Sequence, residues 1–142
     1  MSVCPKCDRT LNADEFYAGS TKICKGCMTW QNLSYNAKKE GHAVGFTKPT
    51  FLTWYGLSAN RACSYCDISE AAFTGLGRKN PRGYHVQCLG VDRSDSSKGY
   101  TPQNARFACF VCNRIKSNIF TPDEMELLGS GISDVWKSRG IA

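Results

Sequence analysis

The chain has 142 residues, of which 42% are hydrophobic and 21% charged; this suffices for one ordinary domain or two very small ones and is not the composition of a disordered chain. No apolar run approaches the roughly 18 residues that span a bilayer, and no apolar segment follows a basic one near the N-terminus, so we expect no membrane span, no secretory leader and a cytoplasmic location. The net charge of +6 favours an anionic partner, although basic side chains scattered over a solvated surface are the alternative.

The first predicted element is a zinc ribbon in residues 1–30. Two C-x-x-C pairs, Cys4/Cys7 and Cys24/Cys27, flank residues 8–23, and this spacing is typical of a Cys4 zinc site. A segment this short has too little core to fold without metal, so zinc binding would supply its folding energy. The ribbon either contacts nucleic acid or only braces the rest of the chain, and its mixed charges leave both possibilities open.

Residues 31–62 are predicted to be a helical linker with DNA contacts. Trp30, Leu33 and Ala37 recur at helical spacing and Gly41 can end the helix, which predicts a helix over residues 25–40. Its other face is polar and suits phosphates and base edges, although a purely solvated face is the alternative. That face carries Gln31, Asn32, Tyr35, Lys38 and Lys39. A short apolar helix starting at Pro49 then leads to the third cysteine pair.

Residues 63–120 contain the second set of C-x-x-C pairs, Cys63/Cys66 and Cys109/Cys112. In a reducing compartment such pairs serve metal binding or thiol redox chemistry, and four pairs match two tetrahedral Cys4 zinc sites better than one redox site. Cys88 is left over and is predicted to be a buried apolar residue. Residues 67–108 separate the two pairs, which is too many for a simple ribbon, so we expect an insertion that carries the chemistry.

The insertion is predicted to form a loop, a strand, a turn, a second strand and the start of a helix, in this order. Residues 67–82 are rich in Gly, Pro and positive charge and are expected to be a loop whose Arg78, Lys79 and Arg82 grip DNA or are simply exposed. Residues 84–92 and 106–111 favour strands on either side of the turn SDSSKG, and a helix is expected from Cys112. The fourth cysteine pair therefore lies where the second strand gives way to the helix.

This arrangement predicts a second metal site. Asp92 ends the first strand, and Asn113 follows Cys112, so zinc binding would hold the amide opposite the carboxylate. Carboxylate and amide oxygens suit Mg²⁺, with water and substrate phosphate completing its shell. Lys116 and Ser117 follow on the same helix face, where a phosphate would lie.

Residues 121–142 are predicted to form C-terminal helices. Thr121 and Glu124 make a capping box with Pro122 at the first helical position, which predicts a helix through Leu128. Gly129-Ser130-Gly131 would end it, and Ser133 could cap a last helix. These helices are expected to be structural, with self-association as the alternative.

The run from Val91 to Lys116 resembles the HNH, or ββα-metal, endonucleases. It contains Val91-Asp92-Arg93-Ser94-Asp95, Gly99-Tyr100, Asn104, Cys109-Phe110-Val111-Cys112-Asn113 and Lys116 in the family's order. The resemblance implies a small zinc-stabilised α+β protein with a ββα-metal core inserted between zinc knuckles, in which Asp92 and Asn113 bind the catalytic metal and Asn104 pins the loop between strands. With the N-terminal ribbon, the layout is similar to a dimeric type II restriction endonuclease; a homing or phage nuclease is the alternative.

The chain departs from the family at the general base. Much of the family has a histidine after the metal-binding acid, but here Arg93 stands there, and arginine cannot accept a proton. Arg93 is better suited to holding the phosphate. Tyr100 is the first candidate for the base, because a metal and Arg93 would lower the pKa of its phenol, although a packed ring is the alternative. His85 and His42 are further candidates, each requiring the chain to bend.

The sequence therefore predicts a Mg²⁺-dependent homodimeric endonuclease that cuts double-stranded DNA at a palindrome, with two structural zinc ions and one catalytic Mg²⁺ per chain, for which Mn²⁺ or Ca²⁺ could substitute. A zinc-dependent nucleic-acid-binding module without catalysis is the first alternative, and a thiol oxidoreductase the second. The residues expected to bind nucleic acid are Lys38, Lys39, Arg78, Lys79, Arg82, Arg114 and Lys116.

Overall fold

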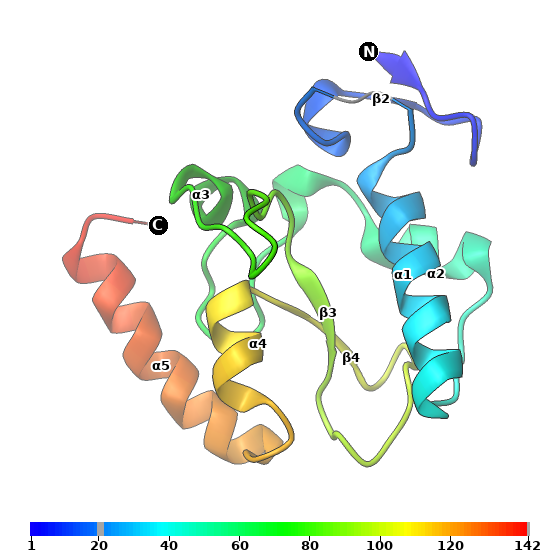
Figure 1. The fold of residues 1–142 in the computed structure, drawn as a ribbon. Helices are drawn as coiled ribbons and strands as arrows, with labels where there is room; N and C mark the ends of the chain where they lie inside the picture. Colours follow the sequence, from blue (N-terminus) through cyan, green and yellow to red (C-terminus); the bar gives the residue numbers. More distant parts are fainter. Residues whose placement is uncertain (20–21, 142) are drawn as a thin grey trace.

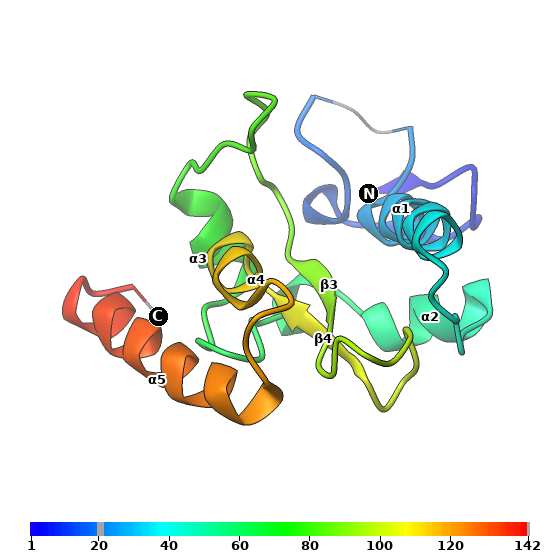
Figure 2. The same cartoon turned by 60° about the horizontal axis from the view of Figure 1, so that its bottom comes forward.

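The computed structural model describes residues 1–19 and 22–141. Within them the chain is a small α+β protein with two separate antiparallel strand pairs (Figure 1). The strands are β1 (Ser2–Val3), β2 (Thr10–Leu11), β3 (Gly90–Arg93) and β4 (Ala105–Ala108); the helices are α1 (Lys25–Glu40), α2 (Lys48–Tyr55), α3 (Glu70–Gly75), α4 (Phe110–Lys116) and α5 (Pro122–Ser138), with 3-10 turns η1 (Ala13–Glu15) and η2 (Ser58–Asn60). The β3–β4 hairpin lies in the middle, with α1 on one side and α4 and α5 on the other (Figures 1 and 2).

Helix α1 has the bounds that the sequence predicts. Cys24 caps its N-terminus, because the Cys24 Sγ accepts a hydrogen bond from the Cys27 amide at 3.4 Å. Gly41 ends it in the left-handed conformation, with φ at 76°, which glycine adopts without strain. The Cys24/Cys27 pair of the ribbon therefore also starts α1, which continues into the linker.

The two strands of the central hairpin are shorter than predicted. β3 begins at Gly90, because the Leu89 amide donates to the Glu70 carboxylate (3.0 Å) and not to a strand partner. β4 ends at Ala108, and the apolar residues expected to extend it open α4 instead. The cause is Cys109, whose Sγ accepts from the Cys112 amide and caps the helix. The cap outweighs the β propensity of residues 110 and 111.

The segment predicted as a loop over residues 67–82 contains a helix, so that prediction is wrong in its first half. Ser69 caps α3 by accepting from the Ala72 amide at 3.1 Å. The loop begins only after Gly75, and Arg78, Lys79 and Arg82 lie in it, all exposed. A serine cap followed by three good helix formers was the signal that the glycine-rich stretch obscured.

Helix α5 is continuous, where two helices were predicted. Its start is as expected, with the Thr121–Glu124 capping box and Pro122 in the first turn. Gly129 does not break it; it is buried against Tyr65, and a Cβ at this position would overlap the Tyr65 carbonyl. The glycine therefore allows α5 to pack closely against the Cys63–Cys66 segment, and this tertiary contact overrides its low helix propensity.

Two clusters of buried apolar side chains each enclose one group of four cysteines. The first includes Leu11, Phe16, Leu33, Phe51 and Tyr55. The second includes Ile68, Phe73, Leu89, Met125 and Trp136. Phe107 of β4 packs against both, so the hairpin joins the two halves of the core. None of the helices in the described residues combines the length and apolar character that crossing a bilayer requires.

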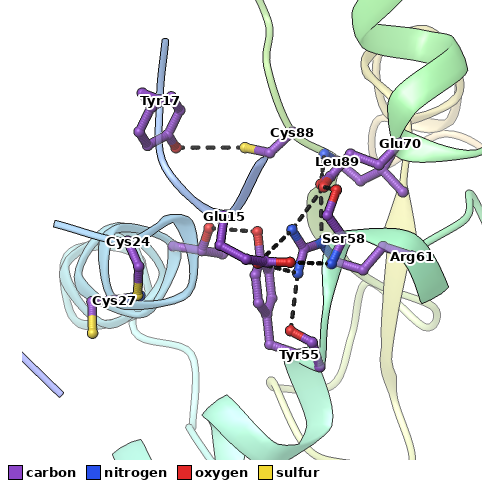
Figure 3. Close-up of polar contacts among 12 residues, drawn as sticks. Glu15, Tyr17, Cys24, Cys27, Tyr55, Ser58, Arg61, Glu70, Cys88 and Leu89 are labelled. Carbon is purple, nitrogen blue, oxygen red and sulfur yellow. Dashed lines mark hydrogen bonds and ion pairs between the residues drawn. The ribbon is translucent and has the colours of Figure 1, made fainter. Parts of the chain in front are cut away.

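A buried ionic network ties the ribbon to the hairpin (Figure 3). Arg61 is 1% exposed and its guanidinium lies 2.7 Å from Glu70 and 3.2 Å from Glu15. Glu70 also accepts from the Ser58 hydroxyl at 2.6 Å. Because Glu70 accepts from the amide of Leu89, this network sets the point where β3 begins. It joins residues 46 positions apart, and no local pattern along the chain indicates it.

Replacing Arg61 with methionine should therefore destabilise the protein strongly. Two buried carboxylates would lose their cation, and breaking such a buried pair typically costs about 3–5 kcal/mol. Urea unfolding of the zinc-loaded protein measures this, with Arg139→Met as the control, because Arg139 is exposed and its loss should cost less than about 1 kcal/mol. Equal unfolding midpoints for the two variants would contradict a stabilising role for the network.

Candidate active site

The eight paired cysteines form two Cys4 clusters that can bind zinc. In each cluster the four sulfur atoms lie within 4.8 Å of one another. The Cys4–Cys27 and Cys7–Cys24 sulfur distances are 3.9 Å, and the Cys66–Cys109 distance is 3.7 Å. A tetrahedral zinc with Zn–S bonds of 2.3 Å requires sulfur atoms about 3.8 Å apart. The donor sets therefore fit the metal, and Cys88 belongs to neither cluster.

Both clusters have hydrogen-bond donors directed at sulfur, as zinc thiolates require. The Arg9 Nε donates to the Cys7 Sγ at 3.3 Å, and the Trp136 Nε1 donates to the Cys66 Sγ at 3.3 Å. Burial acts to raise the pKa of Cys4, but backbone hydrogen bonds, led by that of Cys24, outweigh it and lower this pKa to about 6. Thiolate, the form that binds zinc, is thus favoured at Cys4 near neutral pH, whereas burial raises the pKa of Cys24 and of Cys27 in the same cluster.

The second cluster starts α4 and so places Asn113. Cys112 is fixed in the cluster and Asn113 is the next residue, exposed on the first turns of the helix. Asn113 lines a hollow of about 370 Å³ between α1, the segment 85–91 and α4. Tyr100, Val91 and His85 line it too. The amide is therefore presented to an open space that a substrate group can enter.

Asp92 lies on β3 directly after Gly90 and Val91, two residues of this hollow. Its register partner is Arg106 of β4. Its side chain is 11% exposed, and its Oδ2 lies 3.3 Å from the Lys116 ammonium. Since Lys116 follows Asn113 by three residues on α4, the amide and the carboxylate lie on the same side of this helix. Both predicted metal-binding residues thus lie at the junction of β3 and α4.

The predicted DNA contact of Lys116 is wrong. The residue was expected to contact DNA, but it is 0% exposed. Its ammonium binds the Arg93 carbonyl at 2.8 Å and the Ser96 hydroxyl at 3.1 Å, besides the Asp92 carboxylate. A buried lysine with three oxygen partners cannot reach a phosphate in solvent, so its role is to hold the end of β3.

The chain after α1 pairs with the hairpin loop and brings His42 to the site. The Gly45 amide donates to the Tyr100 carbonyl at 2.7 Å, and the Tyr100 amide donates to the Ala43 carbonyl at 2.9 Å. Gly99 is required here, because a Cβ would overlap the Ala43 carbonyl. As a result the rings of His42 and Tyr100 lie 6.5 Å apart, edge to face. The bend that the sequence left open is present.

Arg93 lies between His42 and Tyr100. Its Nη1 donates to the carbonyls of Ser96 and Lys98, the second at 3.1 Å, and lies 3.4 Å from the His42 Nδ1. Because arginine only donates, this contact makes Nδ1 the acceptor, which leaves Nε2 to carry a proton towards Glu40 at 3.1 Å. The guanidinium carbon is 5.7 Å from the Tyr100 ring centre. A positive group and two candidate bases therefore share one corner.

Arg93 acts to lower the pKa of Tyr100, as expected, but the protein groups taken together raise this pKa. Burial raises the pKa of Tyr100 above its ordinary value, and the charge and hydrogen bond of Arg93 only partly oppose this. Desolvation disfavours a phenolate, and one guanidinium at this distance does not compensate for it.

Asn104 holds the loop between the strands, and His85 lines the hollow. The Asn104 amide donates to the carbonyls of Asp95 (3.1 Å) and Gly99 (2.9 Å), and its Oδ1 accepts from the Asp95 amide at 2.9 Å. Asn104 thus acts on the loop conformation and is buried. His85 is exposed and lines the same hollow as Tyr100 and Asn113.

The remaining basic residues expected to bind nucleic acid are exposed. Lys38 and Lys39 lie in the last turn of α1. Arg78, Lys79 and Arg82 lie in the loop after α3, and Arg114 lies on α4, 5.2 Å over the Phe110 ring. These residues lie on α1, on α4 and in the loop after α3, and each of these segments also contributes residues to the hollow.

Sequence reasoning missed Tyr65. Its hydroxyl donates to the Asp92 Oδ2 at 2.5 Å across 27 residues of sequence. Tyr65 sits inside the Cys63–Cys66 knuckle, but no local pattern links the knuckle to β3. Only the packing of the knuckle on the hairpin reveals this contact.

No protein-family model matches the sequence, and no curated protein is significantly similar to it. Among solved structures, the chain is similar to the rare-cutting HNH restriction endonuclease PacI. The two sequences are 73% identical, the match covers 100% of each chain, and the TM-score is 0.96.

Proposed function

Because this chain belongs to the HNH restriction endonucleases, it is a DNA endonuclease of the HNH type, and we propose that it hydrolyses phosphodiester bonds of double-stranded DNA with a divalent metal ion bound by Asp92 and Asn113. The observation that carries the proposal is the 73% identity to PacI over the full length of both chains. The TM-score of 0.96 shows that the two chains share one fold.

The residues at the junction of β3 and α4 fit a hard cation. Asp92 offers a carboxylate and Asn113 an amide oxygen, and these are ligand types that Mg²⁺ accepts alongside water and phosphate. Such an ion, when bound, supplies Lewis-acid polarisation of the phosphoryl oxygen and stabilises the leaving 3′ oxygen. Lys116 and the backbone of β3 keep the carboxylate in place. The open side of Asn113 leaves room for the substrate.

The corner of His42, Arg93 and Tyr100 supports the remaining chemistry. Arg93 donates hydrogen bonds and carries a fixed charge, so it suits the charge that develops on the phosphate. Tyr100 is the first candidate for accepting the proton of the attacking water, with His42 and His85 as the others. Asn104 keeps the loop that carries Tyr100 in one conformation.

The pH profile of cleavage should identify the base. A base works when deprotonated, and the pKa of Tyr100 is raised by burial, so a tyrosine base predicts single-turnover rates that rise about tenfold per pH unit from pH 6 to pH 8. Tyr100→Phe should then lose about 10²–10⁴-fold in rate. A profile that levels off above about pH 7 is that of a histidine base, and His42→Ala and His85→Ala would show which one.

The proposal extends to assembly, partner and location. Two-strand cutting needs two such sites, so a C2 homodimer on a palindromic sequence is proposed. The net charge of +6 and the exposed basic residues of α1, α4 and the loop after α3 suit the DNA backbone. A cytoplasmic location is included, because eight clustered thiols suit a reducing compartment.

Incubation of the purified zinc-loaded protein with plasmid and Mg²⁺ tests the proposal. Linear products with defined ends are expected, and sequencing those ends gives the target and the cut position. Sedimentation with and without the resulting target DNA gives the oligomeric state. If the protein binds DNA with a steep salt dependence but neither nicks nor cuts any sequence, it is a binding module and the proposal is wrong.

A further inference from the structure

The carboxylate of Asp92 is held asymmetrically. Its Oδ2 accepts a hydrogen bond from the Tyr65 hydroxyl at 2.5 Å and forms an ion pair with the Lys116 ammonium at 3.3 Å. Across residues 1–19 and 22–141, no hydrogen bond to the other oxygen, Oδ1, is present. The hydrogen bond and the ion pair meet at the same oxygen, so both hold the carboxylate in one rotation. The second oxygen remains available for a ligand.

Tyr65 is itself a fixed point, because its backbone is held from three directions. It lies between Cys63 and Cys66, two members of the second cluster. The neighbouring Ser64 amide donates to the Phe107 carbonyl of β4 at 2.8 Å. On the other side Gly129 of α5 packs against its carbonyl so closely that no Cβ fits. The hydroxyl position is therefore set by the knuckle, the hairpin and α5 together.

We propose that Tyr65 is a positioning residue for the catalytic metal: it carries the geometry of the Cys63–Cys66 knuckle to Asp92 and orients the free carboxylate oxygen towards the ion. This inference rests on the proposed function, in which Asp92 and Asn113 bind that ion. The two knuckles of one zinc cluster then have parallel roles. Cys109 and Cys112 place the amide of Asn113 at the start of α4, and Cys63 and Cys66 place the carboxylate through Tyr65.

Lys116 has a different part in the same contact. Its buried ammonium also binds the Arg93 carbonyl and the Ser96 hydroxyl, so removing it would disturb the end of β3 as well as Asp92. Tyr65 touches the site through one hydroxyl. Tyr65→Phe therefore removes one hydrogen bond and keeps the ring, which makes it the cleaner variant.

The test is direct binding of Mn²⁺ to the zinc-loaded chain, followed by the loss of the free-ion signal in electron paramagnetic resonance. Tyr65→Phe should bind Mn²⁺ about tenfold more weakly, since partners that orient metal ligands contribute about 10–100-fold to affinity. In cleavage, the Mn²⁺ concentration for half-maximal rate should rise by the same factor. The KM for DNA should be unchanged, and saturating Mn²⁺ should restore most of the rate.

Tyr55→Phe is the matched control, because it also removes a tyrosine hydroxyl that makes one hydrogen bond, here accepting from Thr29 at 3.4 Å. It should leave the Mn²⁺ affinity unchanged, and all variants should retain two zinc ions. Wild-type Mn²⁺ affinity in Tyr65→Phe would overturn the inference. Loss of zinc from Tyr65→Phe would overturn it too, because Tyr65 would then serve the knuckle alone.

Asp92→Ala separates this inference from the function on which it rests. If Asp92→Ala abolishes Mn²⁺ binding while Tyr65→Phe does not weaken it, the metal site stands and only the role of Tyr65 is wrong. If Asp92→Ala binds Mn²⁺ normally, the metal site itself is misplaced and the inference falls with it.

Discussion

Replacing Asp92 with alanine should abolish DNA cleavage, with a loss of about 10³-fold or more in single-turnover rate. The physical reason is that the variant lacks the only carboxylate proposed as a ligand of the catalytic metal, whose charge stabilisation contributes several kcal/mol, and each 1.36 kcal/mol is a factor of ten in rate. When Asp92 is replaced, the Lys116 ammonium keeps its hydrogen bonds to the Arg93 carbonyl and the Ser96 hydroxyl, so the variant should keep its fold, both zinc ions and its affinity for DNA. The measurement is cleavage of target DNA at saturating enzyme and Mg²⁺.

The matched control for this prediction is Asp134→Ala, which removes one exposed carboxylate from α5, away from the hollow. It should cleave DNA at the wild-type rate. Asn113→Ala should show a large loss as well, since it removes the amide oxygen from the same proposed site. Cleavage by Asp92→Ala within tenfold of the wild-type rate would contradict the metal site, provided that its zinc content is two per chain.

The second large effect is expected from the zinc cluster of the nuclease core. The double variant Cys109→Ser, Cys112→Ser should lose one zinc ion and unfold the segment from β4 to α5. Binding of structural zinc contributes about 10–16 kcal/mol to folding in small domains, and Cys109 also caps α4. Metal analysis of the purified protein and circular dichroism measure the two losses, and cleavage should disappear with them.

Cys88→Ser is the control for this variant, because Cys88 lies outside both clusters and contacts Tyr17 at 3.5 Å (Figure 3). It should retain two zinc ions and the native circular dichroism spectrum. Retention of both ions by the double variant would show that Cys109 and Cys112 are not ligands. Titratable thiols in place of bound zinc in the unmodified chain would favour the redox alternative that the four C-x-x-C pairs left open.

Element boundaries were predicted correctly where neighbouring residues decide them, and wrongly where residues far away in the chain decide them. Helix α1 was predicted at both ends, because its Cys24 cap and its Gly41 stop lie next to it in the chain. The strands and α3 were misjudged where a distant group decided the boundary, as the Glu70 carboxylate does for the start of β3. Gly129 reads as a helix breaker in isolation and becomes a packing contact only when Tyr65 lies against it.

The sequence by itself determined the paired cysteines, the order of Asp92, Asn104 and Asn113, and the likeness to HNH endonucleases, because these depend on residue type and spacing along the chain. Only the tertiary structure decided that Lys116 is buried on Asp92, that His42 meets Arg93 and Tyr100, and that Tyr65 holds the carboxylate. These contacts join residues from 24 positions apart, for Asp92 and Lys116, to 58 positions apart, for His42 and Tyr100. They form because packing on the hairpin brings separate elements together. The local pattern of side chains along the chain does not predict that packing.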